Sequence, residues 1–317
     1  MKTVLVEPLT ITSDLLDELA QDLQGGDNSF TSYDSKPTSV EEWVSRVGDA
    51  DQVILANTKM PIEVIEQAPN LKYINIAFTG VDHVPVQAAK DKGILVSNAA
   101  GYSDEGVAEL VIGLTIDLLR TISEADKGIR KGGKAADYLG KEIAGRTVGI
   151  IGTGKIGTRV AEIFKAMGAN LFGYNRSESQ ELKDLGLVFK SLDEVLKESD
   201  IITVHLPQNE ETKDFITDEH YDLMKDSAIL INCARGPIVN TQALAKALNE
   251  GKIAGAGIDV FDTEPPLEEN HPLFDTPNTV LTPHVAYFTE EAMEKRAHIV
   301  FENAVDFLNG KDIKTLV

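Results

Sequence analysis

The sequence predicts an α/β protein of two domains, each a parallel sheet flanked by helices. Short runs rich in β-branched residues alternate with helical patterns along almost the whole chain, which is typical of parallel sheets. The alternation forms two series, separated by a long helical pattern and a polar Gly/Lys-rich segment at 130–145. The length of 317 residues also favours two domains over one.

The first series occupies roughly the first hundred residues. Its strand-like runs lie at 3–8, 52–57, 71–78 and 94–99, and its helical runs at 14–23, 39–47, 62–68 and 86–93. Ser39 and Glu42, three residues apart, predict a capping box at the start of the second helical run.

A single long helix is predicted next, over 103–129, with Ser103 as its N-cap. Its apolar stripe consists of Val107, Leu110, Val111, Leu114 and Leu118. The second series follows, with strand-like runs at 147–152, 169–175, 187–191, 201–207, 228–234, 252–261 and 279–284. The amphipathic pattern at 294–310 predicts a terminal helix suited to packing back on the first domain.

Composition limits the partners of the protein. Thirty Lys and Arg stand against 51 Asp and Glu, a formal net charge of −21, which makes nucleic acid and anionic membranes improbable partners. No apolar run is long enough to span a membrane, and the N-terminus lacks the features of a signal peptide. The one cysteine, Cys233, fits a reducing cytoplasm. No metal site is predicted.

A glycine-rich turn carries the strongest single motif. A buried-strand run at 147–151 leads into Gly152, Gly154 and Gly157, in the order of a GxGxxG motif that opens a helix. Gly152 permits the tight turn, Gly154 lets a pyrophosphate approach the backbone, and Gly157 lets the helix pack on the strand. Lys155 and Ile156 lie between these glycines at the helix N-terminus, which favours phosphate groups. The alternative is a structural turn that binds nothing.

The residues at the end of the next strand bear on the choice of dinucleotide. An acidic residue there usually binds the adenosine ribose and repels a 2′-phosphate. This chain has Asn175, Arg176 and Ser177 instead. Arg176 could pair with a 2′-phosphate and Ser177 could add a donor. We therefore expect NAD(P)H as cofactor, with NADP use favoured or both dinucleotides accepted. In the alternative, Arg176 is merely exposed and Asn175 serves NAD.

Several further motifs occur in order along the chain. They are TGVDHV at 79–84, NCARGPIVN at 232–240, GAGIDVFDTEPP at 255–266 and LTPHVAYFTEEA at 281–292. Together with the glycine-rich turn, they resemble the D-2-hydroxyacid dehydrogenase family, which includes D-lactate, D-glycerate and phosphoglycerate dehydrogenases. The resemblance covers nearly the whole chain and implies transfer of a hydride between nicotinamide and a small 2-keto acid or D-2-hydroxy acid.

The resemblance also implies roles for individual residues. Arg235 matches the arginine that binds the substrate carboxylate, and its planar guanidinium suits a bidentate contact. His284 matches the histidine that exchanges the proton with the substrate oxygen, and Glu264 the acid that hydrogen-bonds this histidine. Asp259 matches a supporting acid near the nicotinamide. Each of these residues, taken alone, has an ordinary structural explanation. Their occurrence together, in the motifs of this family, favours a functional role.

Other residues receive weaker assignments. By the same resemblance, the backbone N–H groups around Thr79 and Gly80 would hold the substrate carboxylate. The stretch containing Cys233 and Ala234 would lie near the nicotinamide, although Cys233 is equally explained as a small buried residue. His205 follows a strand and would lie near the cofactor, although packing explains it as well.

The family fold implies two Rossmann-like domains with a cleft between them. Residues 1–100 and 288–317 would form the substrate domain, and residues 101–287 the dinucleotide-binding domain. The helix at 104–121 is where the family builds a homodimer, so its apolar stripe is either partly interface or ordinary core.

The substrate remains open within the family. Ile76 stands where phosphoglycerate dehydrogenases carry an arginine, which disfavours a phosphorylated substrate. We expect reduction of hydroxypyruvate or glyoxylate. The alternatives are D-lactate or bulkier 2-keto acids of the phenylpyruvate type, for which aromatic residues (Phe78, Tyr102, Tyr287 and Phe288) could line a pocket. A dinucleotide-sensing regulator similar to co-repressors that resemble this family is a further alternative.

Overall fold

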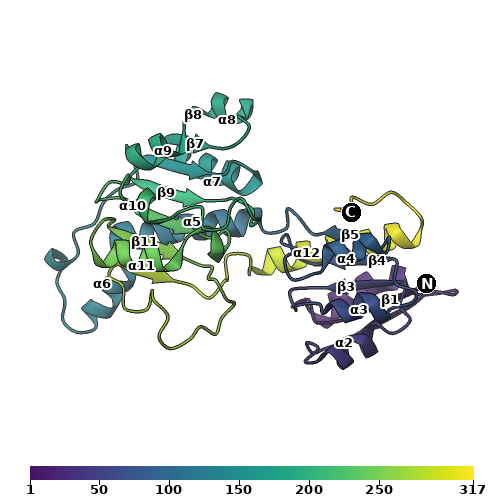
Figure 1. The fold of residues 1–317 in the computed structure, drawn as a ribbon. Coiled ribbons are helices and arrows are strands. Elements are labelled where there is room, and N and C mark those ends of the chain that lie inside the picture. Colours follow the sequence, from purple (N-terminus) through teal and green to yellow (C-terminus); the bar gives the residue numbers. More distant parts are fainter. The chain divides into compact units, whose positions relative to one another are not determined.

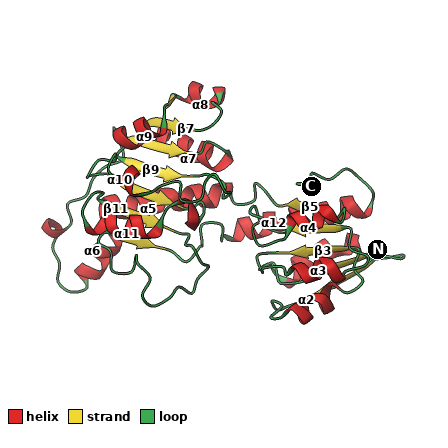
Figure 2. Ribbon diagram, viewed as in Figure 1, coloured by secondary structure: helices red, strands yellow, loops and turns green.

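The computed structural model describes residues 1–317, which divide into two compact units. Unit 1 comprises Met1–Ser103 and Phe288–Val317, and unit 2 comprises Asp104–Tyr287. Each unit contains one parallel sheet flanked by helices (Figures 1 and 2), which confirms the predicted fold class. The assignment of substrate binding to the first unit and dinucleotide binding to the second stays a prediction. None of the helices combines the length and apolar character that a membrane span requires.

The sheet of unit 1 has five parallel strands in the order β2-β1-β3-β4-β5. The strands are β1 (Lys2–Leu5), β2 (Ser29–Ser32), β3 (Gln52–Leu55), β4 (Tyr73–Ile76) and β5 (Leu95–Asn98). The edge strand β2 was not predicted. Its residues are mostly exposed and polar, so it has no apolar pattern, and it forms through backbone pairing with β1.

Helices cover both faces of this sheet, as its fully buried strands β3 and β4 require. They are α1 (Ser13–Ala20), η1 (Gln21–Leu23), α2 (Val40–Val47), α3 (Ile62–Gln67), α4 (Val86–Asp91) and α12 (Glu290–Leu308). The terminal helix α12 contacts β3 and β4 (Figure 1). The last segment of the chain therefore completes the core formed by the first hundred residues.

Buried polar side chains fasten α12 to the sheet. Asn75 Nδ2 donates to the carbonyl oxygen of Val300 at 2.6 Å, and Gln52 Nε2 donates to that of Ala304 at 3.3 Å. Both side chains are fully buried. Because a buried amide that loses its partner keeps its desolvation cost, these bonds fix the position of α12 along the sheet.

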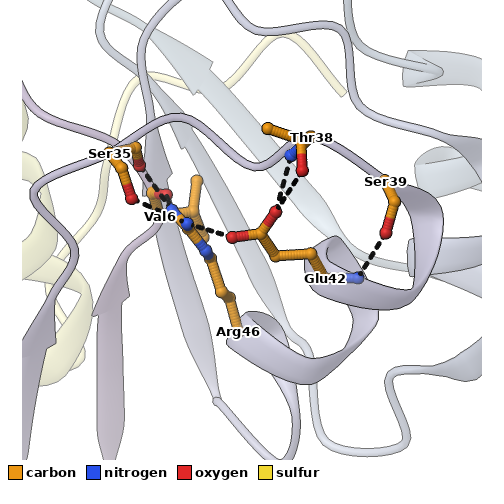
Figure 3. Close-up of polar contacts among 6 residues, drawn as sticks. All are labelled: Val6, Ser35, Thr38, Ser39, Glu42 and Arg46. Carbon is orange, nitrogen blue, oxygen red and sulfur yellow. Dashed lines mark hydrogen bonds and ion pairs between the residues drawn. The ribbon is translucent and has the colours of Figure 1, made fainter.

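The start of α2 differs in one detail from the predicted capping box. Ser39 Oγ accepts the N–H of Glu42, as predicted, but the Glu42 carboxylate accepts from the N–H and hydroxyl of Thr38 rather than from Ser39 (Figure 3). Glu42 also pairs with the buried Arg46, whose guanidinium donates to the carbonyl oxygen of Val6 at 2.7 Å. The bonds to Thr38 and Arg46 lower the pKa of Glu42 to about 2.

The sheet of unit 2 has seven parallel strands in the order β12-β11-β10-β9-β6-β7-β8. The strands are β6 (Thr147–Ile151), β7 (Asn170–Tyr174), β8 (Leu187–Phe189), β9 (Ile201–Val204), β10 (Ile229–Asn232), β11 (Gly255–Ile258) and β12 (Thr279–Leu281). The order reverses at β6, since β7 and β9 pair with its two sides. In open parallel sheets, ligands bind beyond the carboxyl ends of the strands at such a reversal.

Two apolar cores lie on the two faces of this sheet. Side chains alternate between them along each central strand: Ile229 and Ile231 of β10 belong to one core and Leu230 to the other. The helices are α5 (Asp104–Arg120), α6 (Ile122–Ile129), α7 (Lys155–Ala166), α8 (Gln180–Leu185), α9 (Leu192–Glu198), α10 (Asp218–Tyr221) and α11 (Thr241–Asn249), with short 3₁₀ turns η2 (Ala135–Asp137) and η3 (Gly236–Ile238).

The prediction of one long helix over 103–129 is wrong. The helix breaks at Thr121, whose φ of 50° is left-handed, and α6 starts after it. The carboxylate of Asp117 accepts the N–H of Ser123 at 2.8 Å and its hydroxyl, and so caps the new helix. The apolar stripe of α5 belongs to the core of unit 2, where Val107, Val111 and Leu114 are buried. Of the two alternatives for this apolar stripe, the structure therefore favours the core of unit 2.

We expect Asn75→Ala to destabilise unit 1 by about 1–3 kcal/mol, because it removes the buried bond to Val300. Denaturant unfolding followed by the fluorescence of Trp43, the only tryptophan and a buried residue of unit 1, measures this change. The exposed Asn70→Ala is the matched control and should cost about 0.5 kcal/mol or less. Equal effects of the two variants would contradict the role of the buried amide.

Candidate active site

The glycine-rich turn joins β6 to α7 at the point where the sheet order reverses. Gly152 has a φ of 95°, and a Cβ there would lie 2.7 Å from the carbonyl carbon of His205. A Cβ on Gly157 would lie 2.1 Å from the carbonyl oxygen of Gly152. Neither position can hold a side chain. Because both residues are glycines, α7 can start directly against β6.

The same turn has the features that a dinucleotide phosphate requires. Gly154 is the N-cap of α7, and a Cβ there would meet no atom within 4 Å. The hydroxyl of Thr153 is buried and has no hydrogen-bond partner. A cavity of about 500 Å³ adjoins these residues. Its charged lining consists of two cations and four carboxylates: Lys155, Arg159, Asp104, Glu105, Glu162 and Glu181. Open space, an unsatisfied hydroxyl and the positive end of a helix together fit a pyrophosphate.

The loop after β7 shows how the three residues at the ribose position are held. Asn175 Nδ2 donates to the carbonyl oxygen of Ser177 at 2.9 Å. Arg176 forms an ion pair with Glu211, a residue that sequence reasoning did not select. Thirty-five positions separate the two residues, so no local pattern could have revealed their contact.

His205 follows β9, next to the glycine-rich turn. Its Nε2 and the hydroxyl of Thr203 share a hydrogen bond of 2.9 Å. Although part of the residue is accessible to solvent, the surrounding protein desolvates the imidazole and lowers its pKa to about 3. The ring is therefore neutral at physiological pH. The backbone of His205 packs against Gly152 of the turn, and contact of its side chain with the cofactor stays a prediction.

The segment after β10 positions Arg235 through the side chain of Asn232. Asn232 Oδ1 accepts the N–H of Ala234 at 3.0 Å, and Nδ2 donates to the carbonyl oxygen of Arg235 at 3.0 Å. A Cβ on Gly236 would lie 2.0 Å from the backbone of Phe261, so the loop lies tightly against the next strand end. Arg235 Nη1 donates to the carbonyl oxygen of Ala234 at 2.7 Å.

Cys233 lies in the same segment and is buried. Burial, with a smaller contribution from the nearby Asp259 carboxylate, raises the pKa of its thiol well above the ordinary value. The sulfur is therefore a neutral thiol. Its place near the nicotinamide stays a prediction.

His284 and Glu264 form a pair. The Nδ1 of His284 lies 2.9 Å from Oε2 and 3.0 Å from Oε1 of Glu264. Because a carboxylate only accepts hydrogen bonds, Nδ1 carries the proton that it donates, and Nε2 is the nitrogen left for other chemistry. The ring of Tyr287 packs edge-on against the imidazole at 5.3 Å.

Asp259 holds the segment that carries His284. Its buried carboxylate accepts the hydroxyl of Thr282 at 2.6 Å and the N–H groups of Val285 and Ala286 at 2.9 Å each. Its carbonyl oxygen accepts the N–H of His284 at 2.8 Å. Burial raises the pKa of the Asp259 carboxyl, against the opposing effect of these donors. The structure thus gives Asp259 a positioning role; contact with the nicotinamide stays a prediction.

Parallel pairing brings these residues to one edge of the unit 2 sheet. Arg235, Asp259 and His284 follow β10, β11 and β12, which are neighbours, and the glycine-rich turn follows β6 two strands further along. The carboxyl ends of all these strands face the same way. The His284–Glu264 pair, the Arg235 guanidinium and the glycine-rich turn therefore share one edge.

The predicted carboxylate loop lies in unit 1, after β4. Asn98 Nδ2 donates to the carbonyl oxygen of Thr79 at 2.6 Å, and the N–H of Ala99 donates to that of Phe78 at 3.0 Å. These bonds use carbonyl oxygens of the loop and leave the N–H groups of Thr79 and Gly80 without a protein acceptor. The loop could therefore present two donors to a carboxylate.

An aromatic cluster lies behind this loop. Phe78 and Tyr102 are buried, with their ring centroids 6.0 Å apart, and the guanidinium of the buried Arg296 lies 5.4 Å from the first ring and 5.8 Å from the second. Arg296 also donates to the carbonyl oxygen of Leu9 at 2.6 Å. Two of the four aromatic candidates for a substrate pocket are thus packed into this cluster, whereas Phe288 is exposed.

No group of three or more His, Cys, Asp or Glu side chains is arranged to hold a metal ion.

Comparison with protein families identifies the second half of this architecture. Residues 112–286 match the model of the "D-isomer specific 2-hydroxyacid dehydrogenase, NAD binding domain". A glyoxylate reductase of Aeropyrum pernix is 40% identical over 292 residues, which cover 89% of this chain and 87% of that protein. A hydroxypyruvate reductase of Blautia hydrogenotrophica is 34% identical over 286 residues, covering 88% of each.

Solved structures agree with this comparison. An acyclic imino acid reductase, Bsp5, in complex with NADPH and D-Arg has a TM-score of 0.90 and 32% identity, with 100% of both chains covered. A D-lactate dehydrogenase from Aquifex aeolicus complexed with NAD and lactic acid has a TM-score of 0.85 and 30% identity, covering 98% of this chain and 96% of that one.

The two glycines of the turn provide a matched test of this geometry. Gly157→Ala should destabilise unit 2 by about 3 kcal/mol, because the new methyl group meets the backbone of Gly152. Gly154→Ala should cost about 1 kcal/mol or less, yet weaken dinucleotide binding, because its methyl group points into open space. Thermal unfolding and titration calorimetry measure the two effects. Greater destabilisation by Gly154→Ala would contradict the described turn.

Proposed function

Because the chain belongs to the D-isomer specific 2-hydroxyacid dehydrogenase family, we propose that it reduces small 2-keto acids of the glyoxylate and hydroxypyruvate type. The protein is an oxidoreductase that acts on CH–OH groups and uses a nicotinamide cofactor. The main support for the proposal is that Arg235 and the His284–Glu264 pair lie at the same edge of the unit 2 sheet.

The residues of this edge suit reduction of a carbonyl group. When bound, a reduced nicotinamide supplies the hydride for the carbonyl carbon. The protonated His284 delivers its Nε2 proton to the carbonyl oxygen and is left as the neutral ring with its proton on Nδ1. Glu264 stabilises the positive charge of the protonated ring and holds its orientation. Arg235 binds the substrate carboxylate and polarises the keto group.

Two observations support a small substrate. Relatives that share 40% and 34% identity with this chain are named glyoxylate reductase and hydroxypyruvate reductase. Within unit 1, Phe78 and Tyr102 are packed against Arg296 and contribute little to an open pocket for a bulky side chain. No comparison favours the alternative of a dinucleotide-sensing regulator.

We propose that the site accepts NADPH, alone or together with NADH. Asn175 removes the negative charge that would repel a 2′-phosphate, and Arg176 supplies a cation beside it. Ser177 adds a hydroxyl donor. A structural relative at 32% identity was solved with NADPH, so the fold accommodates this cofactor.

We propose a homodimer in which a second copy covers the segment around α6. No residue of α6 is buried, and large apolar side chains project from this segment, with Ile129 65% and Leu139 94% exposed. In Figure 1, α6 and the chain after it extend away from the sheet of unit 2. Exposed apolar residues concentrated in one segment mark an interaction surface.

Sedimentation velocity tests the dimer. The wild-type protein should sediment as a dimer, and the double variant Ile129→Lys/Leu139→Lys should sediment as a monomer, because two charges at a buried interface are unfavourable. Leu316→Lys, which alters an exposed leucine elsewhere, is the control and should stay dimeric. A wild-type monomer, or a dimeric double variant, would remove this assignment.

The catalytic pair predicts a large effect of one substitution. His284→Ala should lower kcat for glyoxylate reduction by about 10²–10⁴-fold and leave dinucleotide binding intact, because Nε2 acts on the substrate. Glu264→Gln should reduce kcat less. His298→Ala, on the exposed side of α12, is the control and should be fully active. Unchanged turnover in His284→Ala would contradict the proposed chemistry.

Arg176→Ala tests the choice of dinucleotide. It should weaken NADPH binding by roughly tenfold, which corresponds to the loss of one hydrogen bond between charged groups. NADH binding should be almost unchanged. Titration calorimetry with both dinucleotides measures this. The exposed Lys246→Ala, which removes a cation that is likewise paired with a carboxylate, serves as control for the loss of one positive charge. If Arg176→Ala affects both dinucleotides equally, the 2′-phosphate role of Arg176 is wrong.

A further inference from the structure

The guanidinium of Arg176 is bound by a carboxylate of the protein itself. Arg176 Nη2 donates to Oε2 of Glu211. We propose that Glu211 is a specificity-determining residue, which competes with the 2′-phosphate of the dinucleotide for Arg176 and thereby sets the preference between NADPH and NADH. This inference rests on the proposed function, in which Arg176 pairs with that phosphate.

The sheet topology brings the two residues together. Arg176 lies in the loop after β7, and Glu211 in the loop after β9. Because β7 and β9 flank β6 on its two sides, their loops leave the same edge on either side of the glycine-rich turn. The ion pair therefore joins the two loops beside the phosphate-binding turn.

The backbone on which Glu211 stands is fixed. Asn209 Oδ1 accepts the N–H groups of Glu211 at 2.9 Å and Thr212 at 3.1 Å, while the N–H of Asn209 donates to the hydroxyl of Thr212 at 2.8 Å. Thr212 is buried, and its hydroxyl donates to the carbonyl oxygen of Pro207 at 2.6 Å. The carboxylate is thus presented from an anchored turn.

A carboxylate and a phosphate use the same guanidinium donors. A 2′-phosphate that binds Arg176 either displaces the Glu211 carboxylate or lies beside it and is repelled by its charge, whereas NADH, which has no 2′-phosphate, leaves the pair intact. Glu211 therefore lowers the affinity for NADPH selectively. Since both side chains are about three-quarters exposed, 76% and 74%, solvent screens the pair, and the expected effect is about two- to fivefold in affinity.

Glu211→Gln tests the inference directly. It should tighten NADPH binding about two- to fivefold and leave NADH binding unchanged, as measured by titration calorimetry at low ionic strength, where surface charges are least screened. Glu210→Gln is the matched control: it removes the same charge from the adjacent exposed residue, which has no bond to Arg176, and it should affect NADPH binding less than Glu211→Gln.

The double variant Arg176→Ala/Glu211→Gln completes a thermodynamic cycle. If Glu211 acts through Arg176, Glu211→Gln should lose its effect in the Arg176→Ala background. If Arg176→Ala weakens NADPH selectively but Glu211→Gln matches Glu210→Gln, or tightens both dinucleotides equally, the role of Glu211 is overturned and the proposed cofactor stands. If Arg176→Ala affects both dinucleotides equally, the proposed 2′-phosphate contact itself fails.

Discussion

The buried carboxylate of Asp259 is the interaction on which the candidate active site depends. Its two oxygens accept three hydrogen bonds from Thr282, Val285 and Ala286, the residues on either side of His284. The backbone of His284 adopts a φ of 55°, which is unusual for a residue with a side chain. A buried charge costs free energy unless its donors are in place. The carboxylate and the turn around it therefore stabilise each other, and His284 is fixed relative to β11.

The parallel sheet of unit 2 extends this constraint to the rest of the site. Because β6, β9, β10, β11 and β12 are parallel, every loop that follows them leaves the same edge. Tight packing then fixes each loop: Gly236 against the backbone of Phe261, and Gly157 against Gly152. Residues that lie far apart in the sequence are thereby gathered, and the site needs few direct bonds between its own side chains.

Short-range patterns explain what the sequence could predict. The glycine-rich turn, Arg235, Glu264 and His284 are each recognisable from neighbouring residues, and the alternation of strands and helices predicts both sheets. The break at Thr121 could not be predicted, because the apolar pattern continues through it and the hydrogen bond from Ser123 to Asp117 that caps α6 has no signature in the sequence. The edge strand β2 has no apolar pattern. It forms through backbone pairing with β1, which its side chains do not indicate.

Three further sets of contacts were not predicted from the sequence. The sequence did not predict that the Asp259 carboxylate holds the turn around His284, and its place near the nicotinamide stays a prediction. Asn232, which holds both Ala234 and Arg235, lies at the end of a buried strand, where an asparagine carries no distinctive signal. The ion pair of Arg176 with Glu211 depends on strand order, which local patterns do not specify.

Loss of absorbance at the reduced nicotinamide band tests most directly whether the protein reduces 2-keto acids. The assay compares glyoxylate, hydroxypyruvate, pyruvate and phenylpyruvate, each with NADH and with NADPH. We expect oxidation of the dinucleotide with glyoxylate and hydroxypyruvate, faster than with the other two acids, and with NADPH as an accepted cofactor. Absence of any absorbance loss across the four acids, in folded protein that binds the dinucleotide, would contradict the proposed reaction.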